Sequence, residues 1–419
     1  ASFNLTNFDA AMKHMYPYKK VENLVYKNNP LLAMIPKETK FPGKNATYAV
    51  EYGMTTGRSA TFATAQNNRG GTLLKDFVVT RVKDYAVVSV DNETLLAADG
   101  NEGSLLDVAK SKTDSALHAL SRAMGRDIFR SGTGAIGQCH ASTAPSGDTS
   151  LELITGHGIN FEVGMRIKGS ATDGSALYDG VLEVTGVNRE SDVLTVNVNS
   201  TTGIPSLSTS VFLYVEGDAA NAGSNIKMAG VDAWLPARDA SSGLVPSASF
   251  FNVARRTDPT RLAGQNQDFS TSAQQTIINA AVKTNREGGR PDACFMNPTD
   301  WAELALDLEG KALVADASNR RRYDNKDTSA KFGFSALSIA TPAGMVDIYS
   351  DHNCPINVAY LLQLDTWALK SLGQAPRILD FDGLKGIRES NSDGVEYRWG
   401  YYGNLLCKAP GFNCRIALA

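Results

Sequence analysis

The sequence has few of the residues that build chemical sites, and each shortage excludes a class of protein. Only five cysteines and five histidines occur among 419 residues. The cysteines are odd in number and scattered, so we expect reduced thiols that act as small apolar side chains, with no disulfide framework. No segment has the ~18 uncharged apolar residues that a membrane helix needs, so we expect no membrane partner.

A basic excess is also missing. The formal net charge is −3 and the sequence pI is about 6.0, which is unlike a general nucleic-acid-binding protein. Hydrophobic residues make up 42% of the chain and charged residues 20%, a globular composition. The length predicts two or three domains of ordinary size. Any contact with nucleic acid must therefore be local.

The first third of the chain does not have the pattern of a compact domain. A polar, irregular stretch with short helical turns covers residues 1–43. A strand is predicted at 46–52, a Gly/Ser/Thr/Asn-rich tip at 55–71 and a long return strand at 77–90, which together form an extended hairpin. A helix of about 40 Å follows, with a start near Ser104 and a stop at Ser131 and Gly132. An arm and a hairpin of this kind can bury their surface only against other copies of the protein, which indicates assembly.

The long helix has a recognisable start and an apolar stripe. Ser104 and Asp107 form a capping-box-like pair in which Asp replaces the usual Glu. We expect Leu117 and Leu120 to face a sheet and Lys112 to lie on the exposed side. The apolar stripe consists of Leu106, Ala109, Leu117, Leu120, Met124 and Ile128.

The middle and the end of the chain have different patterns. Residues 146–217 contain short strands separated by Gly, Asp, Asn and Ser turns, typical of a small antiparallel barrel or sandwich inserted between two linkers. After residue 226 the pattern is mixed α/β. Ser272 and Gln275 form a capping box at a helix start, and residues 293–296 are a predicted short strand.

The motifs that would indicate a cofactor or a metal are incomplete. Gly132, Gly134 and Gly137 spell G-x-G-x-x-G, but they follow a helix, whereas the dinucleotide fingerprint follows a strand. We interpret them as a helix stop. His352 and Cys354 supply only two of the four ligands that zinc takes. The other close pair, Cys139 with His140, lies in a predicted linker.

Two further charged groups have competing interpretations. Asp380 and Asp382 resemble the start of a calcium loop without its other ligands, so salt bridges to Arg377 or Arg388 are favoured. The basic cluster of Arg320, Arg321 and Arg322 is either a contact with nucleic acid or an acidic partner face, or a solvated loop diluted by neighbouring aspartates. No nucleophile, acid/base or metal constellation stands out, so we predict no catalytic residue, no cofactor and no metal.

The order of these parts resembles one family. Stretches that carry the resemblance are FNLTNFDAAM and NPLLAMIPK near the start, GRSATF at the hairpin tip, RSGTGAIGQ after the long helix, DPTRLAG, FMNPTDW, YLLQLDTWALKSLGQAPRILD and GYYGNLLCKAPGFNCRIAL. Together they resemble the major capsid protein of tailed double-stranded DNA bacteriophages, with the Hong Kong 97 capsid fold. The resemblance covers nearly the whole chain, and the β segment resembles an insertion domain of some members.

The resemblance implies an α+β fold with an N-terminal arm, an extended β-hairpin loop, a long spine helix, peripheral and axial α/β domains and an all-β barrel-like insertion. The implied divisions are an arm at 1–43, the extended loop at 44–90, the peripheral domain at 91–145 with its spine helix at 101–131, the β insertion domain at 146–217, the peripheral return at 218–265, the axial domain at 266–392, and closing strands of the peripheral domain at 393–419.

The same resemblance implies a shell protein of the virion that is assembled in the host cytoplasm. It would form pentamers and hexamers of an icosahedral head around double-stranded DNA, contacted without sequence specificity. Scaffolding, portal and decoration proteins are the implied partners. The expected inter-subunit contacts are Arg58, Phe62, Arg69, Lys75, Arg320, Arg321 and Arg322. The alternatives are a mixed α/β enzyme with a β-type substrate or carbohydrate-binding module, and an adhesive virion protein.

Overall fold

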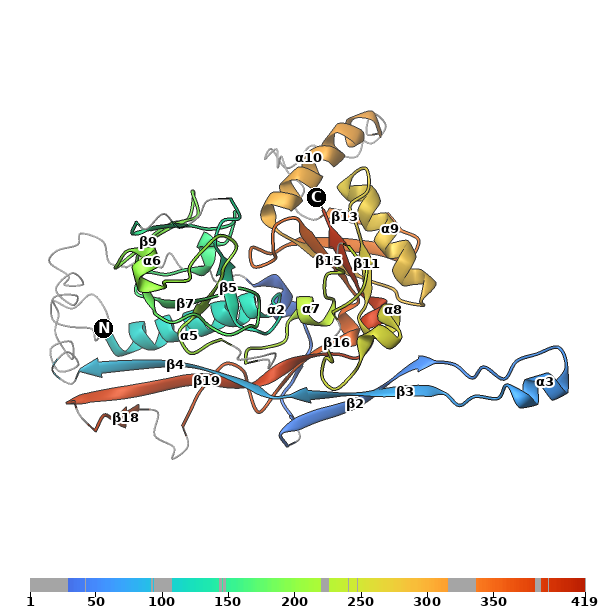
Figure 1. The fold of residues 1–419 in the computed structure, drawn as a ribbon, viewed down its shortest axis with the longest axis horizontal. Helices are drawn as coiled ribbons and strands as arrows, with labels where there is room; N and C mark the ends of the chain where they lie inside the picture. Colours follow the sequence, from blue (N-terminus) through green and yellow to red (C-terminus); the bar gives the residue numbers. More distant parts are fainter. Residues whose placement is uncertain are drawn as a thin grey trace, which may run out of the picture.

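The computed structural model contains three six-stranded sheets and one two-stranded sheet in the part of the chain it describes. Figure 1 shows two bodies above a long sheet, with a hairpin that leaves the molecule at one end. The described residues are 29–41, 43–91, 93, 108–142, 145, 148–219, 226–239, 241–246, 248–315, 337–380, 386–390 and 392–418. Most of the predicted arm, the Ser104–Asp107 pair, Asp382 and the Arg320–Arg322 cluster lie outside these residues.

The protruding hairpin pairs β2 (Asn45–Gly53) with β3 (Leu73–Thr80), and a short helix α3 (Phe62–Asn67) stands at its tip. The predicted return strand at 77–90 was wrong in one respect, because the strand is interrupted at Arg81. The Arg81 guanidinium donates to the carbonyl of Gly43 and lies over the Phe41 ring, which holds the root of the hairpin. The chain then continues as β4 (Val82–Asp91) in another sheet.

The long sheet is built around β19 (Gly394–Cys407), which pairs with β4 over the whole length of β4. Helix α5 (Val108–Asp127) packs on this sheet and buries Leu120 and Met124, as the apolar stripe predicted. The remaining strands are β16 (Trp367–Ser371), β1 (Lys37–Glu38), β17 (Arg377–Ile378) and β18 (Gly386–Arg388), and the short helix α2 (Pro30–Met34) packs beside α5.

Helix α5 ends before the predicted position at 131. The carbonyl of Ile128 accepts from the N–H of Val231, and that of Arg130 accepts from the N–H of Gly230. These tertiary bonds turn the chain out of the helix, and Gly132 follows with a left-handed φ of 85°. Residues 101–107 of the predicted helix lie outside the described part of the chain.

A second, all-antiparallel sheet follows α5 and closes on itself. Its strands run in the order β5-β10-β7-β8-β9-β6. A bridge between Cys139 and Leu153 joins the first strand to the last, so the sheet forms a small barrel with its own apolar core. Its elements are β5 (Ala135–Gln138), β6 (Ser150–Glu152), η1 (Gly158–Asn160), β7 (Arg166–Ser170), β8 (Leu182–Asn188), β9 (Val193–Val196), α6 (Ser200–Gly203) and β10 (Phe212–Val215).

The predicted start of the β insertion at residue 146 is corrected by strand β5. The segment 135–138 was assigned to the preceding domain, but Phe212 and Leu213 of β10 pair with Gln138 and Gly137. Ile136 is buried in the barrel core. The barrel therefore begins at β5, earlier than the turn-rich pattern indicated.

The third sheet mixes parallel and antiparallel strands and carries helices. The Ser272 side chain accepts from the N–H of Gln275 and starts helix α9 (Ala273–Arg286), as predicted. The strand predicted at 293–296 is β12 (Ala293–Met296). The other strands and helices are β11 (Gln265–Gln267), α10 (Pro298–Ala315), β13 (Leu337–Thr341), β14 (Gly344–Ser350), β15 (Val358–Leu362) and β20 (Cys414–Ala417).

Two predicted boundaries of the third sheet change. Strand β20 was expected to close the peripheral domain, but it lies between β11 and β15 in the third sheet. Strands β16, β17 and β18 were assigned to the axial range, but they pair with β19. The buried Asn413 redirects the chain between the two sheets, because its side chain accepts from Gln363 N–H and Trp367 Nε1–H. Short connecting helices are α7 (Val231–Trp234), η2 (Arg255–Thr257), α8 (Pro259–Leu262), η4 (Leu364–Thr366) and η5 (Pro410–Phe412).

Candidate inter-subunit contact surface

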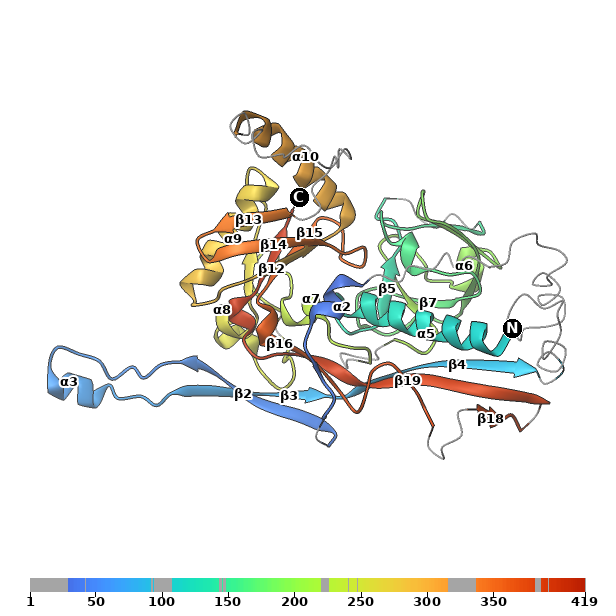
Figure 2. The ribbon, with the colours of Figure 1, turned by 180° about the vertical axis from the view of Figure 1, so that it is seen from behind.

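The hairpin tip exposes large apolar side chains. Phe62 is 82% exposed and Met54 78% exposed, and Leu73 and Leu74 on β3 are also exposed. Both views of the fold show the hairpin pointing away from the rest of the molecule (Figures 1 and 2). Apolar groups gathered on an exposed, protruding element indicate a protein contact surface.

The tip has a defined local structure. The Thr61 hydroxyl donates to Thr64 Oγ1 at 2.7 Å at the start of α3. Across the loop, the Thr56 hydroxyl donates to the carbonyl of Asn68. These bonds hold the two sides of the tip together and leave the Phe62 ring exposed.

The structure brings three of the predicted contact residues to the tip. Arg58, Phe62 and Arg69 are all exposed there, and Gly57 lies against the backbone of Arg69. Lys75 lies farther back on β3, opposite Val50, and is half-buried. Arg320, Arg321 and Arg322 lie outside the described residues, so their predicted role stays a prediction.

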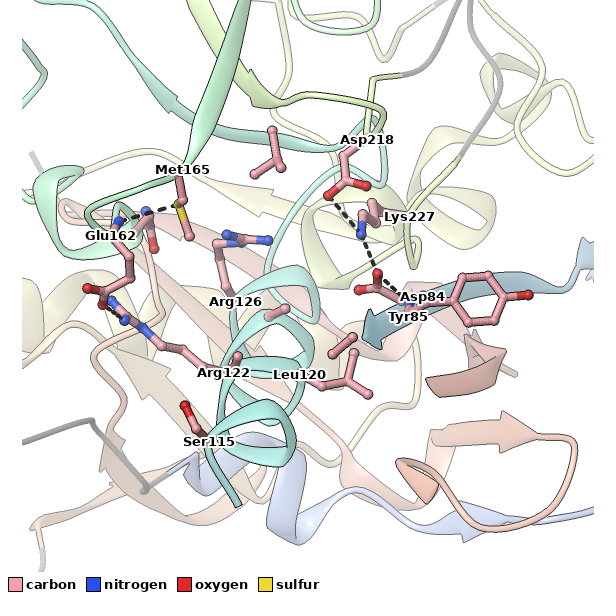
Figure 3. Close-up of a pocket in the computed structure, with 15 residues that line it drawn as sticks. Asp84, Tyr85, Ser115, Leu120, Arg122, Arg126, Glu162, Met165, Asp218 and Lys227 are labelled. Atoms are coloured by element: carbon pink, nitrogen blue, oxygen red, sulfur yellow. Dashed lines mark hydrogen bonds and ion pairs between the residues drawn. The ribbon is translucent and has the colours of Figure 1, made fainter. Parts of the chain in front are cut away.

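A cavity of about 410 Å³ lies at the other end of the molecule, between α5, β4 and the barrel. Figure 3 shows Leu120 and Arg122 of α5 on one side, Glu162 and Met165 of the barrel on another, and Lys227 on a third. Sequence reasoning missed this cavity, because its walls come from segments that are far apart in the chain. The apolar stripe of α5 was its only local signal.

Charged side chains around the cavity are paired within the chain. Lys227 Nζ lies 2.8 Å from Asp84 Oδ1 and 2.9 Å from Asp218 Oδ2. Burial raises the pKa of Asp84 above its ordinary value, although Lys227 opposes this. Burial alone would lower the pKa of Lys227, but the surrounding carboxylates outweigh it and raise that pKa. The cluster joins β4 to the chain that leaves the barrel.

A second network attaches the barrel to α5. Arg122 on α5 donates to the carboxylate of Glu162 and to the carbonyl of Ile159 in the barrel. Arg189 also pairs with Glu162, at 2.7 Å. A carboxylate between two guanidinium groups fixes the barrel against the helix with charge-assisted bonds.

The motifs considered for cofactors and metals have structural roles. Gly134 has a φ of 98°, and a Cβ there would lie 1.9 Å from the carbonyl oxygen of Asp218, so glycine is required where the chain enters and leaves the barrel. Cys354 is buried, and its thiol lies 3.4 Å from the carbonyl of Val358. All five cysteines are buried free thiols, as expected.

Within the described ranges, no three potential metal-ligating side chains come together. The described helices also include none that is both long and apolar enough to cross a membrane. Asp380 is exposed, and its predicted partner in the calcium-like motif lies in a part of the chain that is not described.

Comparison with known proteins shows what the chain is similar to. Residues 209–387 match the family model of the SU10 major capsid protein. A cyanophage A-1(L) capsid subunit has a similar fold, with a TM-score of 0.55, 12% identity, and coverage of 98% of this chain and 99% of that one. Over residues 209–387 the chain is therefore similar to the SU10 major capsid protein, and it shares its fold with a phage capsid subunit. The structure therefore has the capsid fold that the order of elements predicted, the Hong Kong 97 fold.

Weaker structural similarity extends to other capsids. The capsid subunit of an empty GTA particle aligns with a TM-score of 0.45 and 8% identity, covering 97% of this chain and 96% of that one. The subunit of Mycobacterium phage Bobi aligns with a TM-score of 0.42 and 10% identity, covering 100% of this chain and 99% of that one. No curated protein sequence matches this chain.

Proposed function

We propose that this protein is a capsid shell protein that forms pentamers and hexamers, which close into an icosahedral head around double-stranded DNA. The observation that carries the proposal is the hairpin β2–β3, which projects from the body with an exposed apolar tip. An isolated two-stranded hairpin is marginally stable in water, so it gains order from a neighbour. Arg58, Phe62 and Arg69 are the proposed contact residues.

The parts of the fold then have proposed roles. The β19 sheet with α5 would be the peripheral domain, the third sheet with α9 and α10 the axial domain, and the barrel an insertion domain. Exposed apolar residues of the third-sheet body, such as Leu306 and Met345, would contact neighbours around the axis of a capsomer. A scaffolding protein, a portal and a decoration protein are proposed partners, and packaged DNA would be contacted without sequence specificity.

We also propose that the protein is not an enzyme. The charged groups around its large cavity are committed to ion pairs that join segments of the chain. The buried thiols of Cys139 and Cys407 have pKa values raised to about 12 by burial, which disfavours the nucleophilic thiolate. These features support a structural role over catalysis.

Size-exclusion chromatography with light scattering tests the proposal. Rings with five or six copies, or closed shells, are expected from the purified chain supplied with its assembly partners. A chain that stays a monomer or a dimer under those conditions would contradict the proposed function.

A further inference from the structure

A second, much smaller cavity lies where three parts of the chain meet, and we call it the junction cavity. Its volume is about 10 Å³, which is room for one water-sized species. The barrel and the third-sheet body stand next to each other above the long sheet (Figures 1 and 2). The cavity is lined by Arg130 from the segment after α5, by His157 and Asn160 from the barrel, and by His352 and Asn353 from the turn between β14 and β15.

The walls of the junction cavity are closely packed from both sides. Gly156 of the barrel lies so near the turn that an added Cβ would be 2.4 Å from Ile356 Cδ1. On the third-sheet side, the Asn297 side chain donates to the carbonyl of Cys354 at 2.9 Å. On the barrel side, the Asn160 side chain donates to a backbone carbonyl. The cavity therefore has fixed walls.

The charge of the junction cavity comes from Arg130. In the described part of the chain Arg130 forms no ion pair, and its buried Nε has no hydrogen-bond partner there. The carboxylates that act on it are engaged elsewhere: Asp127 lies 3.0 Å from Arg126 Nε, and Asp232 lies 3.2 Å from Arg415 Nε. Burial, followed by Arg126, lowers the pKa of Arg130, but a guanidinium stays protonated in proteins. A buried cation without a counter-charge is costly, so the site favours an anion.

The two histidines add hydrogen-bond donors without adding charge. His157 Nδ1 accepts from a backbone N–H, so the neutral ring carries its proton on Nε2. Burial lowers the pKa of His157 to about 3 and also lowers the pKa of His352, so both rings are neutral at pH 7. The carboxylate beside them, Asp351, already accepts from the N–H groups of Leu31 and Asn353. No carboxylate is among the described residues that line the cavity.

We propose that the junction cavity binds a single halide ion, chloride in ordinary solution, with the Arg130 guanidinium as its counter-charge and His157 Nε2–H as a further donor. The small volume excludes phosphate and carboxylate groups. The bound ion would tie the end of α5 to both the barrel and the third-sheet body. This inference goes beyond the proposed function and does not depend on it, because the site lies within a single chain.

Bromide tests the site directly, because it replaces chloride and scatters X-rays anomalously. Crystals of the full-length chain grown in sodium bromide should show an anomalous peak in the junction cavity, within hydrogen-bonding distance of Arg130. Density in the cavity without an anomalous signal would identify a buried water only and would overturn the proposal. Anomalous peaks confined to other places on the chain would overturn it as well.

Stability in two salts gives a second test. The melting temperature of the unassembled chain in sodium chloride should exceed that in sodium methanesulfonate of equal ionic strength by roughly 2 °C or more, because a ligand that binds the folded state stabilises it. Methanesulfonate is too large for the cavity. Arg130→Gln should abolish this difference between the salts. The control is Arg238→Gln, since Arg238 donates to the carbonyls of Pro259 and Gly264 away from the cavity.

The outcomes of the salt comparison are distinct from those of assembly. Arg238→Gln should keep the full chloride increment even where its melting temperature falls. Equal melting temperatures of the wild type in the two salts, or an undiminished increment in Arg130→Gln, would overturn the halide site. If Arg130→Gln does not fold, the bromide map of the wild type decides. A chain that forms neither rings nor shells would contradict the proposed function and leave the halide site intact.

Discussion

Lys227 Nζ lies 2.8 Å from Asp84 Oδ1, and this ion pair joins the strand that leaves the hairpin to the chain that leaves the barrel. Both side chains are largely buried, with 6% of Lys227 and 12% of Asp84 exposed. Asp218 lies 2.9 Å from the same ammonium group. The cluster therefore connects the long sheet, through β4, to the chain that leaves the barrel.

Replacing Lys227 by Met should destabilise the subunit strongly. The substitution leaves two carboxylates without their cation, and breaking a buried pair costs about 3–5 kcal/mol. Chemical denaturation of the unassembled chain measures the loss. The control is Lys370→Met, whose partner Glu38 is 40% exposed, so a change of about 0–1 kcal/mol is expected. Equal losses for both variants would show that the Lys227 cluster does not stabilise the junction.

Leu120→Ala should also destabilise the fold, because Leu120 is a buried residue of α5, the helix that packs on the long sheet. Truncating a buried Leu costs about 2–5 kcal/mol. Lys112 is unsuitable as the exposed control: its ammonium group donates to the carbonyl of Ser89 at 2.7 Å, contrary to its predicted exposed position. The exposed control is therefore Asp114→Ala, at an exposed site of α5. A normal melting temperature for Leu120→Ala would disprove the packing of this helix.

His157 should make the barrel sensitive to acid. Burial and the nearby Arg130 lower its pKa from 6.5 to about 3, and its neutral Nδ1 accepts from the N–H of Gln138. The unfolded chain therefore binds more protons between about pH 3 and 6.5, so the free energy of unfolding falls as the pH drops through that window.

His157→Asn provides the test, because an amide oxygen can accept the same bond without titrating. Its unfolding midpoint should depend less on pH between about 3 and 6.5 than that of the wild type. The control is His118→Asn, which removes a histidine from α5 and leaves the barrel unchanged. Identical pH profiles for wild type and His157→Asn would rule out a contribution from His157.

The hairpin tip should become ordered on assembly. Residues 55–75 contain few apolar groups, and the large ones among them are exposed in the single subunit. Amide hydrogen exchange there should be fast in free subunits and markedly slower in shells, because contact with a neighbour restricts opening. The buried strand β12 serves as an internal reference. Exchange at the tip that does not change on assembly would contradict an inter-subunit contact.

Local signals in the sequence predicted the elements that they determine. Ser272 marked the start of α9, and the apolar residues 293–296 marked β12, since a cap and a buried strand depend on neighbouring residues. The order of elements also indicated the capsid fold. These features need no knowledge of long-range pairing.

Long-range contacts explain most of the misses. Strand β5 looked like a helix stop because its pairing partner β10 lies beyond the rest of the barrel in the sequence. Arg81 divides the return strand through contacts with Gly43 and Phe41, which no period-two pattern shows. The cavity depends on Asp84, Arg122 and Glu162 meeting in space, so composition and spacing alone could not predict it.

Cryo-electron microscopy of assembled particles tests the central claim most directly. The account predicts closed shells of five- and six-membered rings, in which the hairpin formed by residues 45–80 of each subunit lies on a neighbouring subunit. Discrete monomers or dimers, or shells in which the hairpin contacts only its own subunit, would contradict it.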